Sequence, residues 1–349
     1  EAKKLLSFMN ESNGIPPGVV TYNAFFTGML ETSTPSSEEN DDGDEDNTKF
    51  EKSVDEALRL LDAMHKANVR PNVITAATLV DALGKCKTPR LDEAKALITN
   101  LDADGIVPVG NARVSTALIR ACANSSDLEG ALVAYRGIEK PDIIAFNALL
   151  TSFCRCGRVK TTLQLLSENT KRFKRGLDYI EPDVVTYTIM ISALLDVGTS
   201  NASKGAFKLY KEMKQQWGVM PDNGLVDVIL TAMVSGGNGL GLNDDDMRFT
   251  SDVFRDAKKL QWPDGYLRRR ERTVKAVFVG RMSEMWKEVE VDEDPLFKKK
   301  KWNKIDSGFR LWGGGNNDKA QKPKKSSSTV DEFLESKNWN DMDSSFRIW

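Results

Sequence analysis

The sequence is poor in the side chains on which most catalytic and metal sites depend. It contains one histidine, His65, which we expect on the surface of a helix. Sites that need two histidines are therefore excluded. A zinc deaminase is excluded too, because the chain lacks its His-x-Glu motif with a Cys-x-x-Cys pair. We predict that the chain is not an enzyme and holds neither a metal nor a cofactor.

Cysteine and long apolar runs are scarce as well. The four cysteines lack the spacing of a disulfide framework, which suits a reducing compartment, and we expect all four to pack between helices: Cys86, Cys122, Cys154 and Cys156. No apolar run approaches the ~18 residues of a membrane span, so we predict no membrane association. The first residue is Glu rather than Met, and we expect any targeting peptide to be missing or removed.

What the sequence does contain is a recurring Pro-Asp or Pro-Asn dipeptide, each followed by a helix-length segment. It begins at Pro71, Pro141, Pro182, Pro221 and Pro263. Between the third and fourth copies, the apolar residues Val185, Ile189 and Ala193 keep the four-residue spacing of one helix face. A break at Gly198 to Ser200 follows, with Asn201 and Ser203 as candidate N-caps of a second helix.

A helical hairpin of this kind cannot bury its apolar face alone, which favours a repeat array. The predicted fold is all-α, an α-solenoid of helix-turn-helix repeats with a disordered C-terminal tail. We divide the chain into a partial repeat at 1–18, repeats at 19–72, 73–111, 112–142, 143–183, 184–222 and 223–264, a helical cap at 265–291 and a basic disordered tail at 292–349.

The first complete repeat contains an acidic insertion at 31–48, between its two helices. Residues 38–46 hold seven acids and no base, and without those acids the formal net charge of −2 becomes +5. Such a composition cannot bury enough apolar surface to order itself, so we predict a solvated loop. A docking loop or a phosphorylated segment is the alternative.

The tail contains a duplicated motif, Trp-Asn-x-x-Asp-Ser-small-Phe-Arg-aliphatic-Trp. Tryptophans in a charged tail usually find something that buries them, so we predict two partner-binding elements. Packing back onto the solenoid is the alternative. The residues concerned are Trp302, Phe309, Trp312, Trp339, Phe346 and Trp349.

The proline dipeptides, together with an aromatic residue followed by Asn or Thr in Tyr22-Asn23, Phe146-Asn147 and Tyr187-Thr188, identify a resemblance. The pattern resembles the pentatricopeptide repeat family, in its plain RNA-binding type, over about three quarters of the chain. The tetratricopeptide repeat is the rival two-helix hairpin, and it lacks both features.

The resemblance implies single-stranded RNA binding along the concave face of the first helices, in mitochondria or chloroplasts, for transcript stability, processing or translation. In the family, the residue after the aromatic and the last residue of the repeat read one base. Carried over, the pairs are Asn23 with Asn72, Thr116 with Asp142, Asn147 with Asp183, and Thr188 with Asp222. The second residue of each first helix sandwiches the base, here Val20, Ile74, Arg113, Ile144 and Val185.

Two repeats depart from this pattern, and we expect both to read nothing. The repeat at 73–111 has Ala77 and ends on Val109 or Asn111, while the repeat at 223–264 pairs Asp227 with Asp264. The implied RNA core is 5′-GUG-3′, preceded two positions upstream by a pyrimidine. A protein–protein scaffold, with RNA incidental, is the alternative function.

Overall fold

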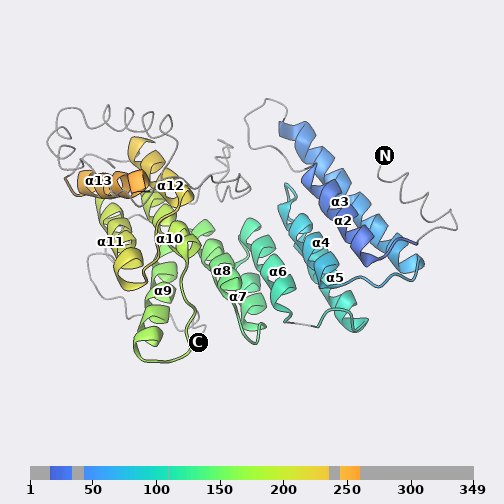
Figure 1. The fold of residues 1–349 in the computed structure, drawn as a ribbon. Coiled ribbons are helices and arrows are strands. Elements are labelled where there is room, and N and C mark those ends of the chain that lie inside the picture. Colours follow the sequence, from blue (N-terminus) through green and yellow to red (C-terminus); the bar gives the residue numbers. More distant parts are fainter. Residues whose placement is uncertain (1–15, 34–42, 109, 236–243, 260–349) are drawn as a thin grey trace. The chain divides into compact units, whose positions relative to one another are not determined.

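The structure, a computed structural model, describes residues 16–33, 43–108, 110–235 and 244–259 (Figure 1). Most of the partial repeat at 1–18, the expected cap at 265–291 and the expected tail lie outside the described residues. The tail residues predicted to bind a partner lie outside them as well, namely Trp302, Phe309, Trp312, Trp339, Phe346 and Trp349. All regular structure within the described ranges is helical, which agrees with the predicted all-α, α-solenoid fold class.

The described residues form two units, one ending at Cys156 and the other beginning at Gly157. The helices of the first unit are α2 (Val19–Glu31), α3 (Gly43–Lys66), α4 (Val73–Lys85), α5 (Leu91–Ala103), α6 (Ala112–Asn124), α7 (Leu128–Arg136) and α8 (Ile143–Arg155). Helices α2, α4, α6 and α8 pack in succession against one another, and α3, α5 and α7 cover them (Figure 1). These two layers are the hairpin stacking of a helical repeat protein.

The second unit repeats the same pairing of helices. Its helices are α9 (Val159–Lys174), α10 (Val184–Val197), α11 (Ser200–Gln216), α12 (Asn223–Ser235) and α13 (Asp244–Lys259). Helix α10 packs against α9, α11 and α12, and α13 packs against α11 and α12. We call α2, α4, α6, α8, α10 and α12 the first helices of their repeats.

The core follows from the position of aromatic and alanine residues within each hairpin. The fourth residue of three first helices is a fully buried ring, in Tyr22, Phe146 and Tyr187. Burying such a ring contributes roughly 2–3 kcal/mol each. A buried alanine on the second helix, as at Ala57 and Ala94, lets the two helices approach closely.

Helix α11 begins earlier than the sequence predicts. Its N-cap is Thr199, whose hydroxyl accepts a hydrogen bond from the backbone N–H of Ala202 at 3.2 Å, so the expectation of a cap at Asn201 or Ser203 was wrong. Gly198 ends α10 in the left-handed conformation, at φ 76°. The left-handed glycine is followed at once by the next cap, which makes the turn between the helices short.

The acidic insertion is also shorter than predicted. Helix α3 begins at Gly43, so residues 43–48, expected in a loop, are helical, and Glu31 is the last residue of α2. The prediction failed because the acidic composition of a solvated loop is also that of a helix N-terminus.

Among the described helices, none is both long enough and apolar enough to cross a membrane.

Candidate nucleic-acid interface

The last residue of a repeat caps the first helix of the next repeat. The side chains of Asn72, Asn111, Asp142 and Asp183 accept hydrogen bonds from backbone N–H groups at the N-termini of α4, α6, α8 and α10. Asp222 does the same for the backbone N–H of Leu225 in α12, at 2.8 Å. Asn and Asp are preferred helix caps. The hydrogen bonds that stabilise the helix ends therefore also fix the positions of these side chains.

The pair Asn23 and Asn72 is brought into direct contact. Nδ2 of Asn23, in α2, donates a hydrogen bond to Oδ1 of Asn72 at 3.1 Å. The buried hydroxyl of Thr75 donates to Oδ1 of Asn23 at 2.7 Å and accepts from the backbone N–H of Asn72 at 3.2 Å. These bonds fix both amides in one orientation.

Capping decides which polar group of the Asn or Asp side chain remains available. Oδ1 of Asn72 accepts from the N–H groups of Ile74 and Thr75 as well as from Asn23, whereas its Nδ2 has no hydrogen-bond partner among the described residues. In Asp142 and Asp222 one carboxylate oxygen caps the helix, and the other has no such partner in the described ranges. An Asn cap therefore leaves a donor, and an Asp cap leaves an acceptor.

The threonines at the fifth position of their helices also have a defined polarity. The hydroxyl of Thr116 donates to the carbonyl of Ala112 at 2.6 Å, and that of Thr188 donates to the carbonyl of Val184 at 2.8 Å. Each hydroxyl has a single hydrogen, so its remaining capacity is that of an acceptor. Thr116 is buried and Thr188 is half-buried.

These threonines and their partner residues lie on helices that pack together. Helix α6, with Thr116, packs against α8, which Asp142 caps, and α10, with Thr188, packs against α12, which Asp222 caps. Asn23 and Asn72 have the same placement on α2 and α4. Asn147 belongs to the first unit and Asp183 to the second, so the structure describes each separately.

The second residue of most first helices is exposed, although several of these residues are apolar. The exposed fractions are 77% for Val20, 41% for Ile74 and 60% for Ile144. Arg113 is exposed and Val185 is half-buried. Because large aliphatic side chains are usually covered in a folded protein, their regular exposure one residue into the helix requires an explanation.

In the first unit, a hollow of about 330 Å³ crosses the first helices α2, α4 and α6. Its lining includes Ile74 and Arg113 from the second position, and Ala77 from the fifth. It also includes Lys85 and Arg120, both of which pair with Asp81, at 2.7 Å and 3.5 Å. Exposed ion pairs of this kind contribute little to stability.

Negative charge at Asp142 reaches the buried ring beside it. The pKa of Tyr135 is raised, first because burial disfavours the phenolate and second because the Asp142 carboxylate repels it. Among the described residues, the hydroxyl of Tyr135 has no hydrogen-bond partner. The phenol of Tyr135 therefore stays protonated.

Two residues of this arrangement were missed or left open from the sequence. Thr75 was not predicted, although its spacing from Asn72 is that of a capping box, and Asp183 and Thr186 share it. For the repeat at 73–111, Asn111 occupies the cap position of α6, because its side chain accepts from the N–H of Arg113 at 3.1 Å. Val109 lies outside the described residues.

The described part of the chain contains no cluster of three or more His, Cys, Asp or Glu side chains suited to a metal ion. His65 is exposed on α3, as expected. The thiols of Cys86, Cys122 and Cys154 are buried between helices, whereas Cys156 is half-buried.

Two family models match the chain. One, described as the PPR repeat family, matches residues 141–196 and again 182–224. The other, described as a pentatricopeptide repeat-containing protein, matches residues 49–138. The tetratricopeptide alternative is thereby set aside, while the plain subtype stays a prediction.

Similar curated proteins come from Arabidopsis thaliana. A mitochondrial pentatricopeptide repeat-containing protein is 29% identical over 133 residues, which are 38% of this chain and 19% of that protein. The chloroplastic pentatricopeptide repeat-containing protein ELI1 is 24% identical over 111 residues, which are 32% of this chain and 16% of that protein. The chain thus spans about a fifth of the length of these relatives.

Similar solved structures include that of the pentatricopeptide repeat protein PPR10 in complex with an 18-nt psaJ RNA element. It is 15% identical, with a TM-score of 0.46, over 72% of this chain and 38% of that chain. A second structure, of PPR10 from maize, is 18% identical, with a TM-score of 0.34, over 78% of this chain and 41% of that chain. The matching family models, the named relatives and the stacked helical hairpins lead to one assignment: this chain is a member of the pentatricopeptide repeat family.

Proposed function

We propose that the chain binds single-stranded RNA along its first helices, reading one base with each complete pair of fifth-position and cap residues. The pairs are those expected from the sequence, Asn23 with Asn72, Thr116 with Asp142, Asn147 with Asp183, and Thr188 with Asp222. Unstacked bases offer their Watson–Crick edges to such side chains, one helical repeat to one base. The pair Asn147 with Asp183 rests on the sequence alone.

The observation that carries this proposal is the polarity that capping leaves behind. The cap occupies one polar atom of the Asn or Asp side chain, so the group left for a ligand is a donor at Asn72 and an acceptor at Asp142 and Asp222. Asn and Asp both cap the helix, but Asn leaves a donor and Asp leaves an acceptor. The choice between them at the end of a repeat can therefore set which base is bound.

The chemistry of the bases matches these polarities. Thr with Asp presents two acceptors, and guanine presents two neighbouring donors, N1–H and the N2 amino group. Asn with Asp combines an amide with an acceptor, which suits uracil with its N3–H donor and flanking carbonyls. The block of three pairs therefore corresponds to 5′-GUG-3′. A mismatched base leaves a donor or acceptor unpaired, which costs about 1–3 kcal/mol.

Exposed apolar residues at the second position give the bases a surface to lie against. Val20, Ile74, Ile144 and the half-buried Val185 would flank successive bases, which accounts for aliphatic side chains at the surface. Arg113, exposed at the same position, would add a charge that favours phosphate.

For the biological setting we propose transcript stabilisation, processing or translation in a mitochondrion or chloroplast. This extends to the chain what the names of its mitochondrial and chloroplastic relatives say of those proteins. A protein bound along a single strand would block nucleases and compete with RNA structure at that site.

The test is selection from a random single-stranded RNA pool by the full chain at two salt concentrations, followed by sequencing. We expect enrichment of GUG and a log–log salt slope of about −0.7 for each phosphate contact. The cap variant Asp142→Asn should keep the fold and shift the first base away from guanine, because it replaces an acceptor by a donor. An unenriched pool with salt-insensitive retention would favour the protein-scaffold alternative.

For the C-terminal tail, we propose binding of a protein partner by the two Trp elements. Cutting the chain at Asp292 should leave RNA affinity unchanged and abolish association with that partner. Changing one element alone should weaken the association more than twofold, since linked sites gain from effective concentration. Identical partners in pull-downs with and without the tail would refute this role.

A further inference from the structure

In the second unit, an aromatic cluster lies outside the residues that the proposed function uses. It consists of Phe173 at the end of α9, Tyr179 in the following loop, and Trp217 at the end of α11. The ring centroids of Phe173 and Tyr179 are 4.8 Å apart, and those of Phe173 and Trp217 are 4.7 Å apart. Phe173 and Tyr179 keep 38% and 40% of their surface exposed. The rings therefore support one another and still face solvent.

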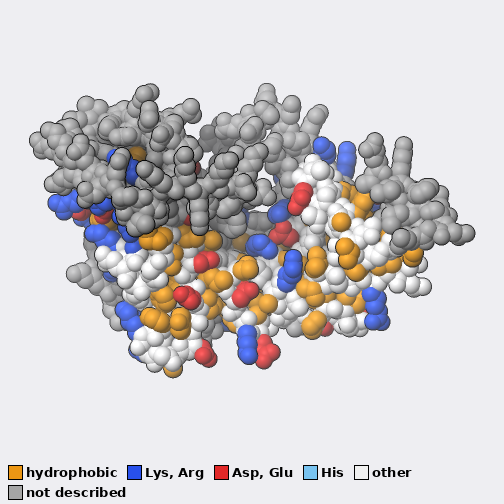
Figure 2. All heavy atoms as spheres, viewed as in Figure 1, with side chains coloured by type: hydrophobic (Ala, Val, Ile, Leu, Met, Phe, Trp, Pro, Cys, Tyr) orange, Lys and Arg blue, Asp and Glu red, His pale blue; other side chains and the backbone are white. Residues whose placement is uncertain are grey.

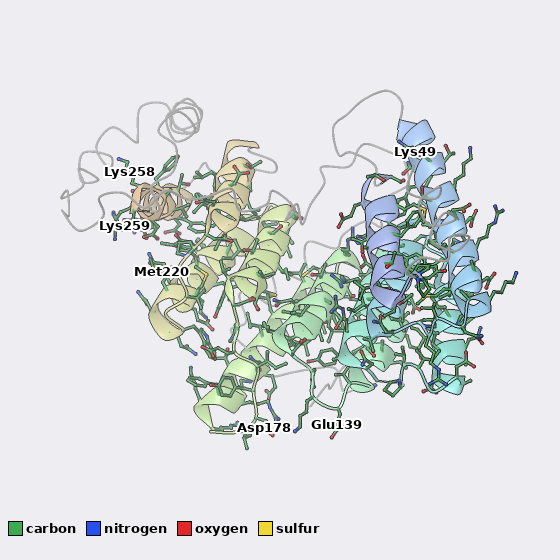
Figure 3. The ribbon with its side chains drawn as sticks, turned by 45° about the vertical axis from the view of Figure 1, so that its right-hand side comes forward. Lys49, Glu139, Asp178, Met220, Lys258 and Lys259 are labelled. Atoms are coloured by element: carbon green, nitrogen blue, oxygen red, sulfur yellow. The ribbon has the colours of Figure 1, made fainter. Side chains whose placement is uncertain are left out.

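The loop that carries Tyr179 is anchored to α9. The buried Asn169 donates from Nδ2 to the carbonyl of Ile180 at 2.6 Å and accepts from the N–H of Ile180 at 2.9 Å. Nε of Arg172 donates to the carbonyl of Asp178 at 2.6 Å. Tyr179 thus stands between two anchored residues, and Figure 3 shows Asp178 at the lower end of α9. The exposed ring is held in place before any ligand binds.

Beside the aromatic cluster, α9 and α11 enclose a cavity of about 470 Å³, which we call the lysine cavity. Lys171, Lys174 and Lys208 line it, against a single acid, Glu212. Burial raises the pKa of Glu212, while Lys208 and Lys174 act to lower it. The side chain of Thr170 is 8% exposed and lines the same cavity. Its hydroxyl has no hydrogen-bond partner among the described residues.

The cavity and the aromatic cluster share one stretch of chain. The last turn of α9 reads Lys171-Arg172-Phe173-Lys174, so Phe173 stands among cationic residues in the chain there. Figure 2 shows hydrophobic side chains next to Lys or Arg over the part of the surface where Figure 1 draws the lower half of α9. Aromatic faces next to converging ammonium groups are what proteins use to hold single-stranded nucleic acid.

We infer that the lysine cavity and the aromatic cluster form a second contact for single-stranded RNA, one that does not depend on base identity. A backbone phosphate would occupy the cavity, with donors from the lysines and the unpartnered Thr170 hydroxyl. A base would stack on Tyr179 or Phe173, because every base has a π-face. Three lysines outnumber the two nearby acids, Glu212 in the lining and Glu168, which pairs with Lys171 at 3.8 Å, and this excess of positive charge favours the polyanion over a protein partner. The inference rests on the proposed function only in taking RNA as the ligand.

The experiment measures the Kd of the full chain for a 24-nucleotide RNA, with a GUG or a GUU core in unstructured flanks. Tyr179→Ser should weaken binding of both RNAs about tenfold and leave their ratio unchanged, because a lost stack affects all bases alike. Tyr179→Phe keeps the ring and should bind as the wild type does. Lys174→Gln combined with Lys208→Gln should reduce the salt slope by about 0.7 for each lost phosphate contact.

The matched control is Lys66→Gln, which removes one exposed positive charge from α3 and should leave the Kd unchanged. Wild-type affinity in Tyr179→Ser and in the double lysine variant would overturn the inference and leave the aromatic cluster to a protein partner. If the wild type binds both cores equally and Tyr179→Ser weakens both, base reading fails and the second contact stands. A wild-type chain that binds no RNA refutes both.

Discussion

Nδ2 of Asn23 donates a hydrogen bond to Oδ1 of Asn72 across 49 residues of chain, at 3.1 Å. That carbonyl also caps α4, so one oxygen joins two repeats and closes a helix end. The bond leaves Asn72 with an amide that can only donate. The Asn–Asn pair is therefore a fixed polar surface, whose two members are already oriented in the absence of RNA.

Changing this pair from donor to acceptor should change its base preference. Asn72→Asp keeps a preferred cap, so we expect the free energy of unfolding to change by less than about 0.5 kcal/mol. The free carboxylate oxygen would accept from N3–H of uracil and repel N3 of cytosine. We expect a shift toward uracil two positions upstream of the GUG core, measured with RNAs that differ only there. An unchanged uracil-to-cytosine ratio would count against this pair.

The close contact of Gly84 with Ala121 predicts a large stability effect from a small substitution. A Cβ at Gly84, in α4, would stand 2.5 Å from Cβ of Ala121, in α6. Gly84→Ala should therefore force the helices apart and reduce the free energy of unfolding by about 1–3 kcal/mol. The matched control is Gly28→Ala in α2, where a Cβ would meet nothing within 4 Å. It should stabilise by up to about 1 kcal/mol. Equal effects in urea unfolding would refute the tight α4–α6 contact.

A buried carboxylate in the last described hairpin predicts a second large effect. Oδ2 of Asp256 accepts from the hydroxyl of Tyr210 at 2.6 Å and pairs with Lys214, and its side chain is 3% exposed. Asp256→Ala should cost about 2–3 kcal/mol, because it leaves a buried hydroxyl and a half-buried ammonium unpaired. Asp252→Ala, at a half-buried carboxylate that pairs with the exposed Arg255 on the same helix, should cost less than about 0.5 kcal/mol. Urea unfolding of both variants measures the difference between their free energies of unfolding. Equal losses would show that the hydrogen-bond network around Asp256 is not formed.

The buried thiol of Cys122 makes stability depend on pH in the alkaline range. Burial raises the pKa of Cys122 from about 9 to about 11, with Asp127 adding to the effect and Lys95 opposing it. Because the folded-state pKa is the higher one, this contribution is present below pH 9 and is lost as the pH rises toward 11. It amounts to roughly 2 kcal/mol. Relative to Cys122→Ala, the wild type should lose stability between pH 9 and 11, and parallel curves would contradict the shift.

Much of this arrangement could be predicted from the sequence, because the Asn or Asp at the end of a repeat is both a helix cap and the proposed base-reading residue. The proline dipeptides precede first helices, and their Asn or Asp is a helix cap whether or not RNA binds. Local rules therefore predict where Asn72, Asp142 and Asp222 lie. The start of α3 was missed because the acidic composition of residues 38–46 is typical of a solvated loop.

Other features depend on contacts that a linear pattern does not contain. Thr75 reaches Asn23 only because α2 packs against α4, and the sequence shows no more than the capping spacing. Tyr179 reaches Phe173 in a loop that Asn169 anchors through Ile180, eleven residues away, and Trp217 joins them from the end of α11.

The most direct test of base reading is the substitution Thr188→Asn. Thr188 donates its hydrogen to Val184 and is left as an acceptor, whereas Asn would present an amide donor beside Asp222. The measurement compares the Kd of wild type and variant for short RNAs containing GUG or GUU in identical flanks. We predict that the wild type prefers GUG, that Thr188→Asn prefers GUU, and that each preference is worth about 1–3 kcal/mol. An unchanged ranking of the two RNAs would contradict the assignment, even if the protein still binds RNA.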